Sequence, residues 1–208
     1  MTHFTIAKNR FLSQDIEAYY HTEFGGVQHP NNPNYLYKLK NDPHHNWTDT
    51  HLQQAQQQFL QVLLTDLPSI LNNVGFRQLA VCVVPRAKAD STYQPNQLLF
   101  KATVRDAINQ LGNGFVDGTD FIERHTNTKT THLRKPMEGF VNDGSEPYPG
   151  ISSDTCNISK SISGCDILLI DDIYTKTVNI DEDMIQALLT NGANTVTFYA
   201  IGYTIQRQ

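Results

Sequence analysis

The sequence has little of several features that would define a function directly. It has three cysteines, Cys82, Cys156 and Cys165, an odd number with no C-x-x-C spacing. Cys82 and Cys165 lie in or beside expected strands, so we expect buried, reduced thiols there. No apolar run approaches the length of a membrane span, and the first residues lack the charged-then-apolar pattern of a secretion signal. We therefore expect a cytoplasmic protein that does not associate with membranes.

Positive charge is also scarce. The chain has 16 Lys and Arg residues against 21 Asp and Glu residues, and its formal net charge is −5. Direct nucleic-acid binding favours a basic face, so this net charge does not support it, and nucleic acid would be reached through a local patch or a protein partner. The chain also lacks a Gly-x-Ser-x-Gly elbow, a Gly-rich loop ending in Gly-Lys-Ser/Thr, and a Cys/His pair in a nucleophile context.

What the sequence does contain is an alternation of apolar strand patterns with helical periodicity. Strands that alternate with helices predict an α/β fold with an open, mostly parallel sheet and flanking helices. Its 208 residues, 39% of them hydrophobic, suit one compact domain. The expected strands are 79–84, 120–123, 166–170 and 195–201, and the expected helices are 49–64, 97–111 and 180–190.

The N-terminal region, residues 1–75, is less regular than residues 76–208. Clusters of Gly, Pro and Asn interrupt it and favour turns. Pro68, preceded by Asp66 as a candidate cap, predicts the start of a second short helix that Gly75 ends. The other elements expected there are a helix around residues 11–20 and a short strand over residues 35–37.

Residues 167–180 carry the strongest functional signal. Four apolar residues, Ile167 to Ile170, predict a strand buried on both faces, which ends in two adjacent carboxylates, Asp171 and Asp172. A short polar loop and the helix 180–190 follow. Open parallel sheets bind ligands at the carboxyl ends of their strands, beside the first turn of the next helix. Two acids there, followed by hydroxyl-bearing residues, suit a pair of sugar hydroxyls, a metal ion and a phosphate.

This stretch resembles the phosphoribosyl-diphosphate (PRPP) signature of type I phosphoribosyltransferases, closest to their ComF-like branch. That signature is a hydrophobic strand, two acids, a hydrophobic-Tyr-Thr step and then Thr-Gly-x-Thr, and the chain matches it from Ile170 to Thr175. The layout fits over residues 78–204. The resemblance implies Mg²⁺-assisted transfer of ribosyl phosphate from PRPP, or binding of a related phosphoribosyl nucleotide, with loss of diphosphate. The acceptor stays unknown.

The resemblance also implies a role for each part of the site. Asp171 and Asp172 would contact the ribose hydroxyls directly or through the water shell of Mg²⁺, with no direct metal ligand required. Their charge would favour a developing positive ribosyl centre. The loop that would cradle the 5′-phosphate consists of Tyr174, Thr175, Lys176, Thr177, Val178 and Asn179.

Two further segments fall where the family contacts the diphosphate. The loop after the first core strand contains Arg86, Ala87 and Lys88, whose two cations suit a diphosphate, although an ordinary solvated loop is the alternative. The long polar segment 125–155 occupies the position of the family's lid, and its Arg134 and Lys135 would reach the departing diphosphate. An ordinary surface loop is again the alternative. Residues 1–75 would then form a hood over the acceptor pocket.

The sequence departs from the signature just after Thr175. Thr177 replaces the family's Gly, and a β-branched residue disfavours the positive φ that Gly allows there. Asn179 replaces the final Thr. The first turn of the following helix is acidic, which suits the helix dipole but opposes a bound phosphate; its acids are Asp181, Glu182 and Asp183.

Two classes of function therefore stay open. One is a PRPP-dependent transferase. The other is a catalytically degenerate ligand sensor or effector that works with a protein or nucleic-acid partner, and a homo-oligomer is compatible with both. Two weaker patterns near the N-terminal helix have duller alternatives, a polar loop and a small local core. They are a metal site of His44, His45 and His51 with Asp42 and Asp49, and a base-stacking group of Tyr35, Tyr37 and Trp47.

Overall fold

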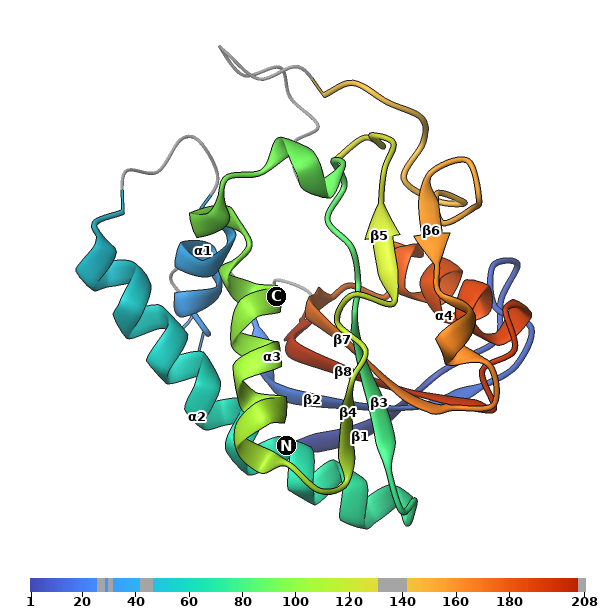
Figure 1. Cartoon of the computed structure of the whole chain (residues 1–208), viewed down its shortest axis with the longest axis horizontal. Coiled ribbons are helices and arrows are strands. Elements are labelled where there is room, and N and C mark those ends of the chain that lie inside the picture. The colour runs from blue at the N-terminus through green and yellow to red at the C-terminus, as the bar shows by residue number, and fades with distance from the viewer. Residues whose placement is uncertain (26–28, 30–31, 42–46, 131–141, 206–208) are drawn as a thin grey trace.

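The computed structural model describes residues 1–25, 29, 32–41, 47–130 and 142–205. Its centre is a six-stranded sheet with the strand order β1-β2-β8-β7-β3-β4, and β5 and β6 form a separate two-stranded ribbon (Figure 1). Only the edge pair β1–β2 of the central sheet is antiparallel; its other pairs are parallel. The predicted α/β class with a mostly parallel sheet and flanking helices is therefore confirmed.

The elements have the following bounds. The central strands are β1 (Thr2–Ile6), β2 (Ile16–Phe24), β3 (Leu79–Val83), β4 (Phe115–Asp117), β7 (Asp166–Tyr174) and β8 (Thr195–Thr204), and the ribbon is β5 (Ile122–Arg124) with β6 (Cys156–Ile158). The helices are α1 (Tyr35–Lys40), α2 (Asp49–Val74), α3 (Leu99–Leu111) and α4 (Ile180–Thr190), with short 3-10 turns at Asp90–Thr92, Pro95–Gln97 and Lys160–Ile162.

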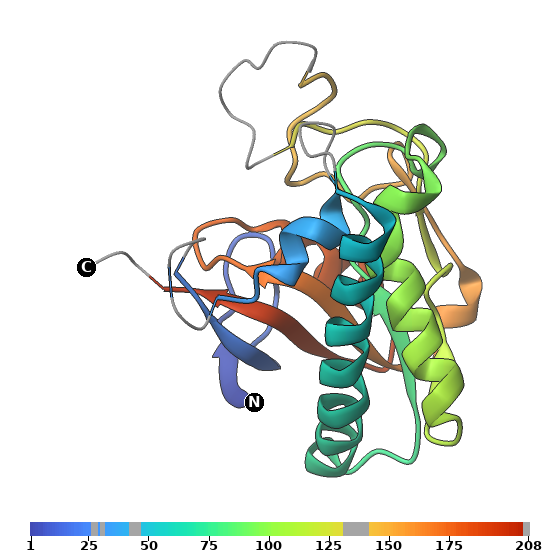
Figure 2. The same ribbon diagram turned by 90° about the vertical axis from the view of Figure 1, so that its left-hand side faces the viewer.

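The sheet separates two hydrophobic layers because alternate residues of each strand face opposite sides. Leu168, Ile170 and Tyr199 point to the face covered by α1, α2 and α3, whereas Leu169 and Phe198 point to the face covered by α4. Figure 2 shows α2 and α3 side by side along one face of the sheet. The expected strands 79–84, 166–170 and 195–201 thus form the buried centre.

Strand β7 is longer than the sequence predicts. Its neighbour β3 pairs with it only as far as Ile170, but β7 continues to Tyr174 because β8 still pairs with it. Asp171 and Asp172 therefore do not end the strand. They lie where β7 extends beyond β3. There the backbone of β7 no longer pairs with β3 but still pairs with β8.

Three expectations for the N-terminal region are wrong. Residues 11–20 are not helical; their second half enters β2, whose alternating residues Ile16 and Ala18 are buried in the core. Residues 35–37 begin the helix α1 rather than a strand. A second helix does not start at Pro68, because α2 runs through it, held by buried residues at helical spacing on both sides, Leu63, Leu67 and Ile70.

Residues 1–75 contain β1 and β2 of the central sheet and the long helix α2, which packs on it. Much of the region expected to form a hood is therefore part of the sheet and its helical layer. Within the described residues, no helix is long and apolar enough to cross a membrane. Of the three free thiols, Cys82 is buried as predicted and Cys156 is also buried, whereas Cys165, which was expected to be buried, is only half-buried. Burial raises the pKa of the Cys82 thiol to about 12.

Candidate functional site

The predicted acid pair lies at the carboxyl edge of the sheet, where Asp172 faces α1. The carboxylate of Asp172 forms an ion pair with Lys40 at the end of α1, with 2.5 Å between Nζ and Oδ2. The side chains of Lys40 and Asp172 are 28% and 15% exposed, so water still reaches the pair. The backbone N–H of Asp172 donates to the carboxylate of Asp171 at 2.8 Å, which fixes the two acids relative to each other.

Asp171 points to the opposite side and meets the first turn of α4. Its carboxyl group shares a hydrogen bond with that of Asp181. Burial raises the pKa of Asp171 to about 6, against the hydrogen bond and the Lys40 charge, which lower it. Burial and the Asp171 charge raise the pKa of Asp181 well above its usual range. Two carboxyl groups in hydrogen-bond contact are most stable when they share one proton.

The acids of α4 are buried rather than directed into solvent, which the sequence does not predict. Glu182 accepts a hydrogen bond from the Tyr174 hydroxyl at 3.1 Å, and burial raises its pKa. Asp183 accepts from the backbone N–H groups of Gly150 and Ile151 at 2.6 and 2.9 Å. Glu182 therefore connects α4 to β7, and Asp183 connects it to Gly150 and Ile151 in the C-terminal part of the predicted lid.

The loop after β7 forms a tight turn closed by a hydrogen bond from Val178 N–H to the Thr175 carbonyl at 2.8 Å. The Thr175 hydroxyl lies 2.8 Å from that of Thr204, and Asn179 accepts from the Asn9 side chain at 3.1 Å. Among the described non-glycine residues, only Asn41 has a positive φ. Thr177 thus adopts an ordinary backbone conformation, and the turn has a shape that does not require glycine.

The two cations predicted for the diphosphate loop hold the chain together. Arg86 donates from Nη1 to the carbonyls of Lys40 and Gln97 at 2.7 and 2.6 Å, and its guanidinium lies 4.3 Å from the centre of the Tyr93 ring. This side chain thus joins the end of α1 to the turn before α3. Arg86 therefore contacts the backbone of Lys40, the residue whose side chain pairs with Asp172.

Lys88 is buried and joins both ends of the predicted lid. Its ammonium donates to the Thr128 carbonyl at 3.1 Å and to the carbonyl and carboxylate of Asp143 at 2.6 and 2.7 Å. The carbonyl of Ala87 accepts from the N–H of Thr128 at 2.7 Å. The two flanks of the lid are therefore fixed to the loop after β3. Arg134 and Lys135, predicted to reach the diphosphate, lie outside the described residues.

The weaker N-terminal patterns fall only partly within the described residues. Asp42, His44 and His45 lie outside the described residues, and His51 is paired locally with Thr48 at 3.1 Å. In the described ranges no group of three His, Cys, Asp or Glu side chains is arranged to hold a metal ion. Tyr35 stacks on Phe59 of α2, with 6.2 Å between ring centres, as expected for a local core.

Sequence reasoning missed two groups near the sheet edge. One is Lys40, whose partner Asp172 is 132 positions away along the chain and could not be read from a local pattern. The other is Asp66, which is not a helix cap but lies in the middle of α2, buried beside Leu67 and Ile70. An acid on the apolar face of an amphipathic helix is a signal that could have been noticed, because a buried charge needs partners.

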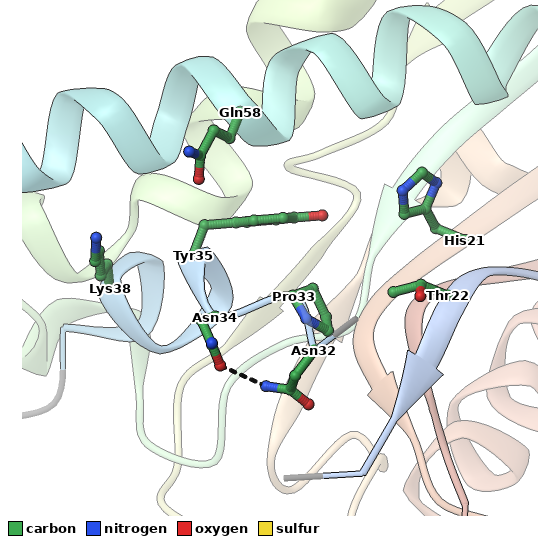
Figure 3. Close-up of a pocket in the computed structure, with 8 residues that line it drawn as sticks. All are labelled: His21, Thr22, Asn32, Pro33, Asn34, Tyr35, Lys38 and Gln58. Atoms are coloured by element: carbon green, nitrogen blue, oxygen red, sulfur yellow. Dashed lines mark hydrogen bonds between the residues drawn. The ribbon is translucent and has the colours of Figure 1, made fainter. Parts of the chain in front are cut away.

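Beside Asp66 the surface is hollowed. A hollow of about 450 Å³ lies between the end of β2, the start of α1 and the middle of α2 (Figure 3). Its lining is polar without being acidic. The residues that form it are His21, Thr22, Asn32, Pro33, Asn34, Tyr35, Lys38 and Gln58.

Comparison with known proteins adds no relative. No family model matches the chain, and no curated protein matches it.

Proposed function

We propose that the protein binds PRPP or a related phosphoribosyl nucleotide with Mg²⁺ at the carboxyl edge of β7, as type I phosphoribosyltransferases do, and transfers ribosyl phosphate with loss of diphosphate. The observation that carries the proposal is the position of Asp171 and Asp172. They lie where β7 outruns β3 in a parallel sheet, just before a turn that leads into α4. This is the edge at which open α/β sheets bind their ligands.

The acid pair suits a ribose because its two carboxylates have different surroundings. Asp172 is partly exposed and paired with Lys40, so ribose hydroxyls could replace the ammonium as hydrogen-bond donors. Asp171 is held by Asp181 behind it and by the Asp172 backbone N–H. This second carboxyl group would fix the orientation of the first.

The donor set fits Mg²⁺ in its hydrated form. Mg²⁺ prefers oxygen ligands, keeps several waters, and binds through one or two carboxylates together with the substrate's phosphates. Asp171 and Asp172 would hold it through water, and the ion would neutralise charge on the leaving diphosphate.

The 5′-phosphate would meet the turn from Thr175 to Asn179 and the backbone N–H groups at the start of α4. The acids of α4 oppose it less than their sequence suggests, because Glu182 and Asp183 are buried and directed at Tyr174 and at the lid. Lys176 supplies a cation in this turn.

A second candidate is a binding-only sensor of the same ligand, and one observation favours it. Arg86 and Lys88, the cations that would stabilise the leaving diphosphate, are engaged with backbone carbonyls and with Asp143. Binding without rapid diphosphate release would follow if these contacts persist in the complex. The two candidates share the ligand and differ only in turnover.

Calorimetric titration with PRPP and Mg²⁺ tests the proposal. We expect the wild type to bind and the Asp171→Asn/Asp172→Asn variant to lose at least about 100-fold in affinity, because two charge-assisted contacts are removed. Asp106→Asn, on the exposed face of α3, is the matched control and should bind as the wild type does. Binding that survives in the double variant would refute the site. Release of diphosphate then separates the transferase from the sensor.

A further inference from the structure

A hydrogen-bonded group of three side chains crosses the layer between β2, β8 and α2. Oδ2 of Asp66, whose side chain is 7% exposed, accepts from the Tyr199 hydroxyl at 2.7 Å and lies 2.9 Å from Nδ1 of His21. Burial by itself would raise the pKa of Asp66, but the hydrogen bonds from His21 and Tyr199 and the His21 charge lower it. An ionised carboxylate only accepts hydrogen bonds, so Nδ1 of His21 carries the hydrogen.

This contact decides which nitrogen of His21 is open to a ligand. When Nδ1–H donates to Asp66, the Nε2 atom of the neutral ring has a lone pair and accepts a hydrogen bond. The side chain of His21 is 34% exposed and lines the hollow beside α1 (Figure 3). The hollow therefore contains a hydrogen-bond acceptor whose orientation is fixed from behind.

Two further polar atoms of the lining have no hydrogen-bond partner among the described residues. They are the hydroxyl of Tyr35 and Oδ1 of Asn32, and both atoms are buried. Asn32 is 8% exposed, and its Nδ2 atom donates to Oδ1 of Asn34 at 2.6 Å, so only its oxygen is left unpaired. Figure 3 shows the hydroxyl end of Tyr35 directed toward His21. Buried polar atoms without partners are rare, and each one calls for a ligand or water.

The hydrogen-bonding roles of these atoms define the class of ligand. Oδ1 of Asn32 and Nε2 of His21 need donors, whereas the hydroxyl of Tyr35 and the ammonium of Lys38 offer hydrogens. An anion would bring lone pairs to two atoms that already have them, and Lys38 disfavours a cation. A hydroxyl group both donates and accepts. A neutral molecule with several hydroxyls on neighbouring carbons can therefore meet all four groups.

The hollow has the size for such a molecule and is separate from the acid pair. Its volume of about 450 Å³ lies within the usual range of small-molecule pockets. Its described lining comes from β2, α1, α2 and the residues just before α1, and includes neither Asp171 nor Asp172. The Tyr35 ring packs on Phe59 of α2, with 6.2 Å between ring centres, which holds its hydroxyl in place.

We propose that this hollow binds a neutral, polyhydroxylated ligand, a monosaccharide or a cyclitol, and that His21, oriented by Asp66, accepts a hydrogen bond from one of its hydroxyls. A second hydroxyl donates to Oδ1 of Asn32, and a further oxygen accepts from the Tyr35 hydroxyl. The binding is non-covalent. It goes beyond the proposed function, because none of its contacts involves PRPP, Mg²⁺ or the acid pair.

Nitrogen-15 NMR of histidine-labelled protein, without PRPP, tests the site. The probes are glucose, galactose, mannose and myo-inositol, and the control is cyclohexanol, which has the six-membered ring of myo-inositol with a single hydroxyl. We expect at least one polyol to shift the His21 Nε2 resonance saturably below about 50 mM, since a few hydrogen bonds give millimolar affinity. Cyclohexanol should bind at least about tenfold more weakly.

The same spectra report the tautomer of His21. A His21→Asn variant assigns the signals and keeps a side-chain N–H for Asp66. We expect the neutral ring to carry its hydrogen on Nδ1, with Nε2 as the atom that responds to the polyol. The opposite tautomer would leave no acceptor in the hollow and would overturn the inference.

Tyr35→Phe separates a binding role from a structural one. The variant keeps the ring on Phe59 and removes only the hydroxyl, so the polyol should bind about tenfold more weakly, the loss expected for one hydrogen bond. The free protein should keep its melting temperature, because this hydroxyl has no partner to lose. Tyr37→Phe, the same change in α1 outside the described lining, is the matched control and should bind as the wild type does.

The outcomes are distinct from those of the PRPP titration. Asp171→Asn/Asp172→Asn should bind the polyol as the wild type does, whether or not the wild type binds PRPP. No His21 shift with any polyol, equal binding of cyclohexanol, or loss of polyol binding in this double variant overturns the inference. So does a saturable His21 shift with uracil and none with the polyols, because the hollow would then take a planar heterocycle.

Discussion

Two aspartates near the same edge of the sheet have opposite electrostatic environments. Asp66 meets two donors, Tyr199 and His21, and their hydrogen bonds lower its pKa although burial opposes them. Asp171 meets another acid, Asp181, and burial raises its pKa to about 6. Burial acts to raise the pKa of both acids; at Asp66 the two donors outweigh it, whereas at Asp171 the hydrogen bond with Asp181 and the Lys40 charge do not.

The difference also separates the tasks of the two regions. Around Asp66 the protein holds one ionised carboxylate that fixes a histidine at a hollow without acidic lining. Around Asp171 it holds an excess of carboxyl groups, balanced only partly by Lys40. The first arrangement suits a neutral ligand that donates hydrogen bonds, and the second suits hydroxyl groups and a hydrated cation.

The largest expected effect on stability is from Asp66→Ala. The change leaves the Tyr199 hydroxyl buried without an acceptor and removes two hydrogen bonds to a charged group, so we expect a loss of about 3 kcal/mol in the free energy of unfolding. Urea denaturation at pH 7 measures it. Tyr199→Phe, which keeps the carboxylate and the volume, should cost about 1–2 kcal/mol. A loss below that of Tyr199→Phe would contradict the central role of Asp66.

Asp181→Asn, which changes the acidic surroundings of Asp171, should raise the stability, whereas Asp66→Ala lowers it. Because the folded-state pKa of Asp171 is raised above its unfolded value, the folded protein holds the extra proton, and stability falls as pH rises from about 4 to about 6. Burial causes the Asp171 shift and persists in the variant, so Asp181→Asn does not recover it. The pKa of Asp181 is itself raised by burial and by the Asp171 charge, and the variant removes this second buried carboxyl group. We therefore expect Asp181→Asn to stabilise the protein by about 1–2 kcal/mol at pH 7.

The same pH series provides the contrast. Asp66 has a lowered pKa, so its contribution is present above the unfolded pKa and is lost as pH falls through the folded value. Below pH 4 the wild type should lose the Asp66 contribution, whereas the difference between wild type and Asp181→Asn should shrink. A stabilisation by Asp181→Asn that does not depend on pH would show that the acid pair is not the cause.

A smaller effect is expected from Asp183→Asn, which alters the anchor of the lid without altering the acid pair. The amide oxygen can keep one contact with Gly150 or Ile151 but loses its charge, so we expect a loss of about 1 kcal/mol in stability. Faster proteolytic cleavage in the segment 142–155 should accompany it. Cleavage at the wild-type rate would mean that the lid is held mainly by Lys88 and Asp143.

The smallest effect is expected from Thr177→Gly. The turn after β7 does not use a positive φ at Thr177, so glycine relieves no strain there and only makes the turn more flexible. We expect PRPP affinity to change by less than about threefold in calorimetry. Binding that tightens by more than tenfold would mean that the bound turn adopts the glycine conformation of the family's signature.

Much of the fold could be predicted because burial on a strand or helix leaves a local pattern. The apolar runs of β3, β7 and β8 and the periodicity of α3 and α4 were correctly placed within a few residues. The acid pair was predicted next to the apolar run for the same reason, and it lies directly after that run, inside β7. The helix α1 and the strand β2 were not predicted, because short segments of mixed polar and apolar residues carry little periodicity.

The sequence alone determined where the apolar faces of the regular elements lie, since the 2.0 and 3.6 residue periods are properties of the local chain. Tertiary structure alone decided which groups meet. Asp66 and His21 are 45 positions apart, and Asp66 and Tyr199 are 133 apart. The charge of Asp66 and of Asp171 depends on partners that other elements supply. His21 and Tyr199 both reach Asp66 because β2 and β8 are neighbours in the sheet, and this pairing is decided by the tertiary structure.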